Sequence, residues 1–137
     1  MIILDTTVVS AMMNDPPEPK VTAWLDTQDR SLIWTTSVTV LEIESGLHFL
    51  SVGERRSGFS QVFERILNSI NHRIAAFDEE AARQSALLMA SRRKIGRPVE
   101  MRDTMIAGIV LAHRAELATR NPAHYADIDA NVVNPWI

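Results

Sequence analysis

The stretch Met1-Ile2-Ile3-Leu4-Asp5 at the start of the chain decides the expected fold class. Its short apolar run predicts a strand buried on both faces, which is typical of parallel sheets. Asp5 follows that run directly, so it lies where the strand leaves the core. In open α/β sheets this carboxyl edge of the strands is where ligands bind. Asp5 is therefore the first candidate functional residue.

Along the rest of the chain, predicted strands alternate with predicted helices. Further strands are predicted over residues 32–36, 74–77, 117–119 and 131–133. Helices are predicted over residues 6–13, from residue 19, and over 37–52, 57–71, 79–94 and 100–114. Ser37 and Asp78 are the expected N-caps of two of them. This order predicts one α/β domain over residues 1–137, with a mostly parallel sheet of four to five strands and helices on both faces.

Composition narrows the classes of function. The 137 residues are 46% hydrophobic and 23% charged, as in an ordinary globular protein. The absence of cysteine excludes a disulfide framework and a thiolate metal site. No run approaches the ~18 apolar residues of a membrane span, and no basic leader is visible, so we expect a cytoplasmic protein without membrane contact. The net charge of −3 argues against a wholly basic surface but allows a local basic patch.

Two further carboxylates, Glu42 and Asp103, interrupt the apolar stripes of predicted helices. The face that Asp103 shares carries Ile106, Ala107, Val110 and Leu111. The face that Glu42 shares carries Val38, Ser45, Gly46 and Phe49. Asp103 is expected to point inward near the strand edge, and the glycine beside Glu42 predicts close backbone packing. Each acid alone has an ordinary explanation, as a helix cap or a partly buried carboxylate. The prediction of a site depends on Asp5, Glu42 and Asp103 together.

Three carboxylates in one place favour a bound cation. Two of them about 4 Å apart repel by roughly 4 kcal/mol at an effective dielectric near 20, so without a cation at least one pKa should rise. An oxygen-only ligand set suits Mg²⁺ or Mn²⁺ rather than zinc. Such an ion can orient water and stabilise charge at a phosphoryl centre. Phosphodiester hydrolysis is therefore the leading reaction.

Other catalytic motifs are absent from the sequence. There is no phosphate-binding GxxxxGK loop, no GxGxxG and no GxSxG elbow. The four histidines, at positions 48, 72, 113 and 124, show no paired spacing and are expected at the surface or at helix ends. A phosphatase of the haloacid dehalogenase type would need a second aspartate two residues after Asp5, where Thr7 stands.

Four short blocks occur in order along the chain: MIILDTT at 1–7, SVTVLEIESG at 37–46, RDTMIA at 102–107 and LATRN at 117–121. Together they resemble the motif blocks of PIN-domain proteins, and most of all the VapC/FitB type of toxin in toxin–antitoxin systems. The terminal Val133-Asn-Pro-Trp136 also looks like that subgroup. The resemblance extends over essentially the whole chain.

The resemblance implies a Mg²⁺- or Mn²⁺-dependent endoribonuclease toxin that a cognate antitoxin holds inactive. It also implies a homodimer that contacts operator DNA only through the antitoxin. Asp5, Glu42 and Asp103 match the acidic metal ligands of the family, and Thr6 matches a hydroxyl beside the metal. A basic patch is expected to grip the RNA backbone, with Arg92, Arg93, Lys94, Arg97 and Arg102. For each of these cations the alternative is a solvated helix end that the helix dipole favours.

The chain departs from the family pattern at a few positions. Thr7 stands where asparagine is usual, and Asn121 and His124 stand where the family often has a further aspartate. Asn121 can ligate or bind water but brings no charge, so the number of metal ions stays open. Asp127 and Asp129 are either substitutes for the missing acid or ordinary loop aspartates. An active ribonuclease and a catalytically weak binding module that works through its antitoxin both remain open.

Overall fold

The sheet has five strands, all parallel, in a computed structural model that describes residues 1–97 and 99–137. The strands are β1 (Ile2–Leu4), β2 (Ile33–Thr36), β3 (Ile74–Ala75), β4 (Glu116–Ala118) and β5 (Val132–Val133). They lie in the order β3-β2-β1-β4-β5. The predicted α/β class and parallel sheet are therefore confirmed.

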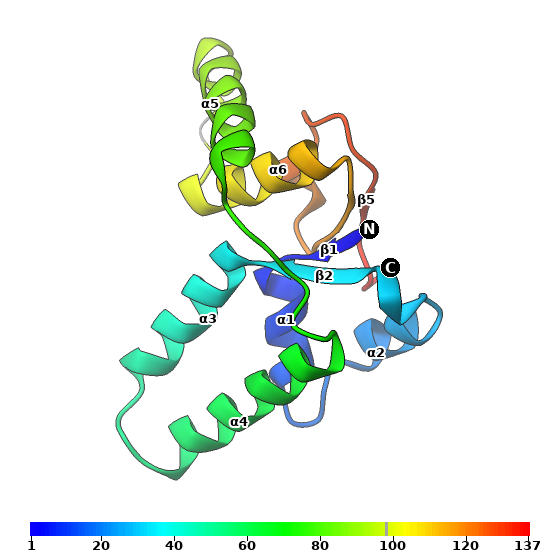
Figure 1. The fold of residues 1–137 in the computed structure, drawn as a ribbon, viewed down its shortest axis with the longest axis vertical. Coiled ribbons are helices and arrows are strands. Elements are labelled where there is room, and N and C mark those ends of the chain that lie inside the picture. Colours follow the sequence, from blue (N-terminus) through cyan, green and yellow to red (C-terminus); the bar gives the residue numbers. More distant parts are fainter. Residues whose placement is uncertain (98) are drawn as a thin grey trace.

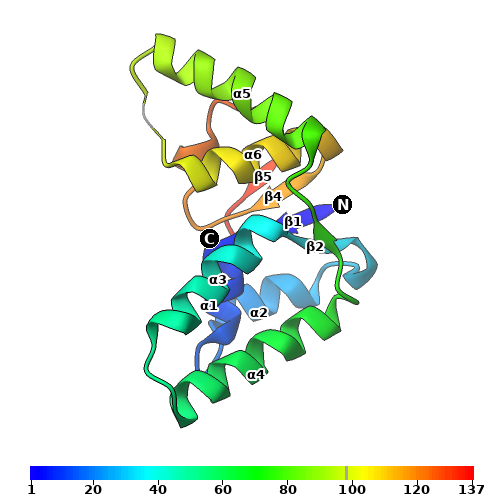
Figure 2. The ribbon, with the colours of Figure 1, turned by 60° about the vertical axis from the view of Figure 1, so that its left-hand side comes forward.

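Helices cover both faces of the sheet. They are α1 (Thr6–Met13), α2 (Pro19–Asp26), α3 (Ser37–Phe49), α4 (Glu54–Ser69), α5 (Glu79–Lys94) and α6 (Met101–His113). Helices α1 to α4 lie on one side and α5 and α6 on the other (Figures 1 and 2). Successive side chains of a strand point to opposite faces, so Ile2 and Leu4 join the core under α1 to α4 while Ile3 joins the core under α5 and α6. Within the described part of the chain, no helix combines the length and hydrophobicity that a bilayer crossing requires.

The strand order reverses between β1 and β4. From β1 the chain moves outward to β2 and β3, and it later returns to the other side of β1 with β4 and β5. Leu4 pairs with Ala118 at the carboxyl ends of the two central strands. Asp5 and Thr119 follow these ends directly. A reversal of this kind is where open α/β sheets bind ligands.

Several helix boundaries differ from those predicted, among them the cap and the end of α3 and the start of α4 at Glu54. Thr36 rather than Ser37 caps α3, since the Thr36 hydroxyl accepts the Thr39 N–H at 3.1 Å. The Ser37 hydroxyl instead accepts the Phe77 N–H at 3.0 Å, which ties α3 to the segment after β3. Helix α3 also ends at Phe49, before residue 52, and Gly53 serves as the N-cap of the next helix.

The backbones of two helices approach each other closely at Gly108, and not at Gly46 as predicted. A Cβ atom on Gly46 would meet nothing within 4 Å, so the predicted close packing there is wrong. A Cβ on Gly108 would lie 1.9 Å from Ser85 Oγ and 2.5 Å from the Ala81 carbonyl oxygen. Helices α5 and α6 therefore touch at Gly108, and this contact sets the position of α6.

Replacing Gly108 by alanine is expected to lower the free energy of unfolding by about 1–3 kcal/mol, because the added methyl group overpacks the α5–α6 contact. Urea denaturation measures this change. Gly58→Ala in α4 is the matched control, since its Cβ would meet nothing within 4 Å and the substitution should stabilise the helix by up to about 1 kcal/mol. Equal denaturation midpoints for Gly108→Ala and the wild type would contradict the packing at α5–α6.

Candidate active site

A cleft of about 370 Å³ opens beside the carboxyl end of β1. The side chains that line it include Asp5, Thr6, Glu42, Asp103, Arg120 and Trp136. The three predicted acids thus line one cleft, although they come from the end of β1, from α3 and from the first turn of α6. The reversal of strand order beside β1 and the helices α3 and α6 together position the candidate site.

Asp5 is almost completely buried at this edge, with 3% of its surface exposed. Its Oδ1 accepts hydrogen bonds from the backbone N–H groups of Thr7 and Val8, at 3.0 and 3.2 Å, and from the Thr7 hydroxyl at 2.5 Å. The Thr119 hydroxyl donates to Oδ2 at 2.6 Å. Burial raises the pKa of the Asp5 carboxyl, the hydrogen bonds lower it, and the charge of Asp103 raises it further. The protein alone therefore does not fully stabilise a charged Asp5.

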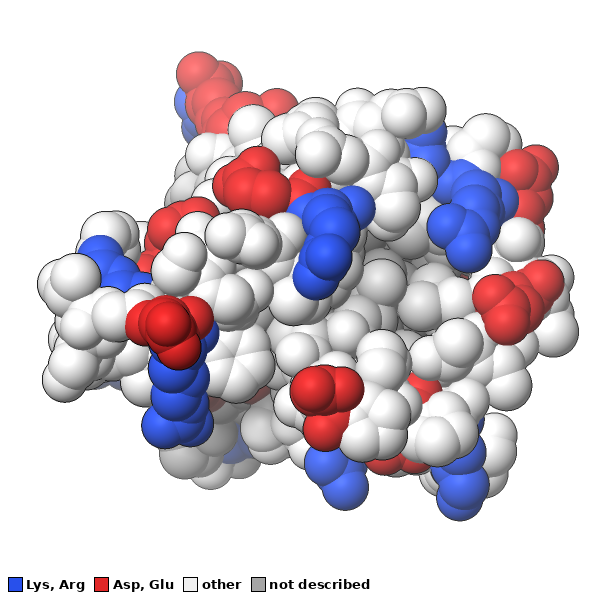
Figure 3. All heavy atoms as spheres, turned by 90° about the horizontal axis from the view of Figure 1, so that it is seen from below, with Lys and Arg blue, Asp and Glu red and all other residues white. Residues whose placement is uncertain are grey.

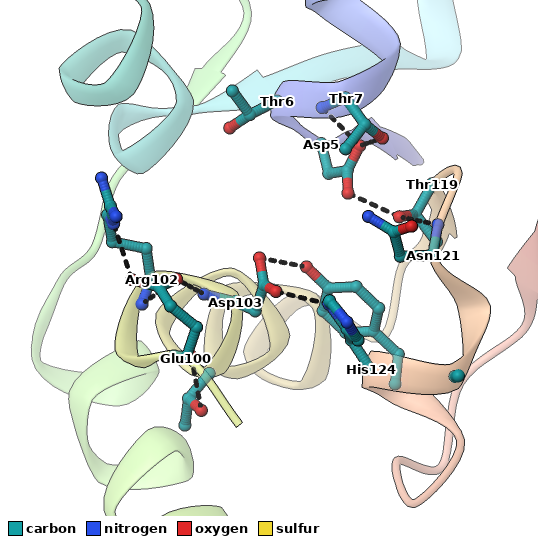
Figure 4. Close-up of polar contacts among 12 residues, drawn as sticks. Asp5, Thr6, Thr7, Glu100, Arg102, Asp103, Thr119, Asn121 and His124 are labelled. Carbon is teal, nitrogen blue, oxygen red and sulfur yellow. Dashed lines mark hydrogen bonds and ion pairs between the residues drawn. The ribbon is translucent and has the colours of Figure 1, made fainter. Parts of the chain in front are cut away.

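Asp103 reaches toward Asp5 from the opposite wall of the cleft (Figure 4). Its Oδ2 lies 2.7 Å from Nδ1 of His124, and its Oδ1 accepts the Tyr125 hydroxyl at 3.2 Å. Both partners belong to the 3-10 helix Pro122–Tyr125. Burial and the nearby carboxylates raise the pKa of Tyr125, so its hydroxyl keeps the proton that it donates. His124 is exposed, as expected, and its ring also contacts Asp103, which its spacing from the other histidines did not indicate.

Glu42 has a different set of contacts. Its Oε1 accepts the Thr6 hydroxyl at 2.8 Å, and its Oε2 lies 3.8 Å from a guanidinium nitrogen of Arg102. Among the described residues, no three acidic, histidine or cysteine side chains converge on one metal-binding position. The prediction that three acids gather around one point is therefore not met by these side-chain positions. All three acids line the cleft, and the charge of Asp103 is the one that raises the pKa of Asp5.

The donors in the cleft fit a hard cation. Mg²⁺ binds proteins through one or two carboxylates and keeps several of its waters, and Asp5 and Asp103 supply two carboxylates. Burial, with a smaller contribution from the charge of Asp103, keeps the pKa of Asp5 raised, and a bound cation would oppose that rise. The cleft can therefore hold an ion whose remaining ligands are waters.

Asn121 follows β4 next to Thr119 and Asp5 (Figure 4). Its backbone N–H donates to the Thr119 hydroxyl at 3.0 Å, which helps to orient the hydroxyl that binds Asp5. Among the described residues its side chain makes no hydrogen bond. The catalytic role of Asn121 stays a prediction.

Arg92 does not belong to a surface patch, and this part of the prediction is corrected. The residue is 3% exposed, and its Nε and Nη2 each lie 2.8 Å from a carboxylate oxygen of Asp127. It also donates to the Thr104 hydroxyl and to the His124 carbonyl, both at 2.8 Å. Asp127 is therefore the buried arginine's partner and not a replacement for the missing acid. Arg92 is therefore a structural residue that binds Asp127, and not the RNA-binding residue that was expected.

The other predicted cations do not form a continuous patch at the cleft. Arg97 lies 3.3 Å from Asp127, and Arg102 lies 2.7 Å from Glu100. Arg93 and Lys94 are exposed in the last turn of α5, and neither lines the cleft. On the face seen from the α4 side in Figure 3, acidic and basic side chains are likewise interspersed. Of these cations only Arg102 lies beside a carboxylate of the cleft among the described residues, 3.8 Å from Glu42.

Several residues of the site were not predicted from the sequence. Thr119 follows a strand as Asp5 does, and this shared position was the available signal. Arg120 and Trp136 lie in stretches that resemble family blocks, but neither was assigned to the site, and Tyr125 reaches it from the 3-10 helix Pro122–Tyr125. Thr7, a departure from the usual asparagine, holds Asp5 through both its N–H and its hydroxyl.

Over residues 2–131 the sequence matches the PIN domain family, and the chain belongs to this family. VapC ribonuclease Y4jK of Sinorhizobium fredii is 33% identical over 99% of this chain and 98% of that protein. Toxin FitB of Neisseria gonorrhoeae is 31% identical, with 99% of each chain covered. The solved structure of FitAB bound to a DNA fragment is similar with a TM-score of 0.90 and 30% identity, covering 100% of this chain and 96% of that chain.

Proposed function

We propose that this PIN-domain chain is the ribonuclease toxin of a toxin–antitoxin pair, and that it hydrolyses RNA phosphodiester bonds in the cytoplasm. The observation that carries the proposal is the facing pair Asp5 and Asp103 in one cleft, with the pKa of Asp5 raised by burial and by its neighbour. The similarity to a VapC ribonuclease along nearly the whole chain supports the same reaction class.

Asp5 and Asp103 would hold a Mg²⁺ ion, for which Mn²⁺ can substitute. The bound ion would orient an attacking water and stabilise negative charge on the phosphoryl group. The residues around the two acids fix their orientation before any ligand arrives. Thr119 and Thr7 fix Asp5, while Tyr125 and His124 fix Asp103. Such support by neighbouring hydrogen bonds typically changes metal affinity or activity by 10- to 100-fold.

Glu42 contributes from the edge of the cleft. Thr6 holds its carboxylate through a hydrogen bond of 2.8 Å, and Arg102 lies 3.8 Å away. From this position Glu42 would bind a water of the metal ion's shell. Thr6 would thus support the site through Glu42.

The proposed partners are a cognate antitoxin protein, a second copy of the chain and RNA. The similar structure contains FitAB bound to DNA, and we extend that kind of assembly to this chain. As the family resemblance implies, the antitoxin and not this chain would contact operator DNA, and the net charge of −3 is consistent with that arrangement.

Adding Mg²⁺ to the metal-free protein is expected to raise its stability by about 2.7 kcal/mol when the ion is at a hundredfold excess over Kd. Differential scanning calorimetry measures this gain, and Asp103→Asn should lose it because one of the two carboxylates is gone. Asp129→Asn, in an exposed loop position, is the control and should respond like the wild type. A wild type that shows no response would instead favour a binding module without a working metal site.

A further inference from the structure

One cation at the cleft is held by an aromatic ring. The guanidinium carbon of Arg120 lies 5.1 Å from the centre of the Trp136 ring, within the range of a cation–π contact. Both residues line the same cleft as Asp5 and Asp103. The arginine therefore lines the cleft of the acidic pair, and among the described residues no acidic side chain pairs with it.

The backbone of Arg120 is fixed to the acidic site. Its N–H donates to the Thr7 hydroxyl at 3.0 Å, and that hydroxyl donates to Asp5 at 2.5 Å. The preceding residue, Thr119, binds the other oxygen of Asp5. The segment that carries Arg120 is therefore linked by hydrogen bonds to both carboxylate oxygens of Asp5.

The ring of Trp136 is also fixed. The backbone N–H of Trp136 donates to Oδ1 of Asn134 at 2.9 Å, and the indole ring packs against the core under α1 to α4. The N–H of Ile137 donates to the Asn134 carbonyl at 3.2 Å, which closes a turn at the chain end. The indole therefore offers a rigid surface to the guanidinium of Arg120.

Unlike Arg120, the other arginines near the site form ion pairs with carboxylates. Arg92 and Arg97 share Asp127, and Arg102 pairs with Glu100. Among the described residues, the Arg120 guanidinium makes no hydrogen bond or ion pair. A cation–π contact gives the guanidinium N–H groups no oxygen acceptor, and those groups have the geometry of a phosphate ligand.

We propose that Arg120, stacked on Trp136, binds a backbone phosphate of single-stranded RNA next to the bond that is cut. Arg120 is then a substrate-binding residue, and Trp136 is a positioning residue that acts through it. The inference rests on the proposed ribonuclease function and adds to it the cation that the predicted patch did not provide. It also explains how an acidic cleft accepts a polyanion, since the positive charge stands within the cleft itself.

RNA binding by the full chain in EDTA tests the proposal without cleavage, by fluorescence anisotropy of a labelled single-stranded RNA over a series of salt concentrations. Arg120→Ala should weaken binding about 5- to 10-fold and reduce the slope of log K against log salt by about 0.7, the value for one phosphate contact. Arg120→Lys should restore the slope but not the full affinity, because lysine keeps the charge and loses the stacking. Arg83→Ala, in an exposed pair with Glu79, is the matched control and should leave both values unchanged.

Trp136→Phe should keep most of the affinity, because phenylalanine retains an aromatic face, and Trp136→Leu should approach Arg120→Ala. Since the ring also packs on the core, thermal melting of each variant accompanies the binding data, and the conclusion stands on the Arg120 variants. If Arg120→Ala binds with the wild-type affinity and slope while the wild type binds and cleaves RNA, the inference is overturned and the proposed function is kept. If the wild type itself neither binds nor cleaves RNA, the proposed function fails, and the inference fails with it.

Discussion

Asp103→Asn is expected to lower kcat/KM for RNA cleavage by about a thousandfold or more, because it removes one of the two carboxylates that hold the catalytic ion. The same variant should keep the metal-free stability to within about 1 kcal/mol, since asparagine can still accept the Tyr125 hydroxyl and no longer repels Asp5. Steady-state cleavage assays and urea denaturation measure the two effects.

The combination of the two measurements separates catalysis from structure. A large loss of stability in Asp103→Asn would indicate that the carboxylate holds His124 and Tyr125 in place and is mainly structural. Unchanged cleavage would mean that the site lies elsewhere or that the activity is a contaminant. Asp129→Asn passes through the same purification and should retain full activity, since this aspartate is exposed in a loop.

Asp127→Ala is expected to have the largest effect on folding, a loss of about 3 kcal/mol, because it leaves the buried Arg92 without its partner. The Arg92 side chain is 4% exposed, and its Nε lies 2.8 Å from Asp127. Asp129→Ala, two residues away, is the control and should change the free energy of unfolding by no more than about 0.5 kcal/mol. If the two alanine variants are equally stable, the buried pair does not stabilise the fold.

The effect of Asp127→Ala should depend on pH. Hydrogen bonding and charge from Arg92 hold the pKa of Asp127 below its ordinary value of 3.8. A carboxyl whose pKa is lower in the folded state stabilises the protein above its unfolded-state pKa, and this contribution is lost as the pH falls through the folded-state value. The difference between the wild type and Asp127→Ala should therefore be complete at pH 7 and shrink below about pH 3.8.

The Arg92–Asp127 pair also has a consequence for the active site. Arg92 donates to the His124 carbonyl and to the hydroxyl of Thr104, the residue after Asp103. It therefore joins the two segments that meet at Asp103, the start of α6 and the 3-10 helix Pro122–Tyr125. Loss of this pair should disturb the orientation of Asp103 as well as the fold.

The order of strands and helices could be predicted because it follows from local patterns. An apolar run followed by an acid marks the end of β1 at Asp5, and helical spacing places Asp103 on the inner face of α6. Each of these two signals is contained in one short stretch of the chain. They were sufficient for the α/β class and for the two acids that share the cleft.

The contacts that complete the site depend on residues far apart in the sequence. The burial of Arg92 requires Asp127, 35 residues later, and nothing in the local pattern of a basic helix end distinguishes a buried arginine from a solvated one. His124 reaches Asp103 from the 3-10 helix Pro122–Tyr125, 21 residues later in the chain. Close packing at a glycine is likewise decided by the facing helix, as Gly46 and Gly108 show.

The central claim is that the paired carboxylates support metal-dependent cleavage of RNA. The direct measurement incubates antitoxin-free wild-type protein with a panel of RNAs in Mg²⁺, in Mn²⁺ and in EDTA, and resolves the products by gel electrophoresis. We expect cleavage with either metal, none in EDTA, and recovery when Mg²⁺ is added back in excess. Cleavage that persists in EDTA, or no cleavage of any RNA with either metal, would contradict a metal-dependent ribonuclease.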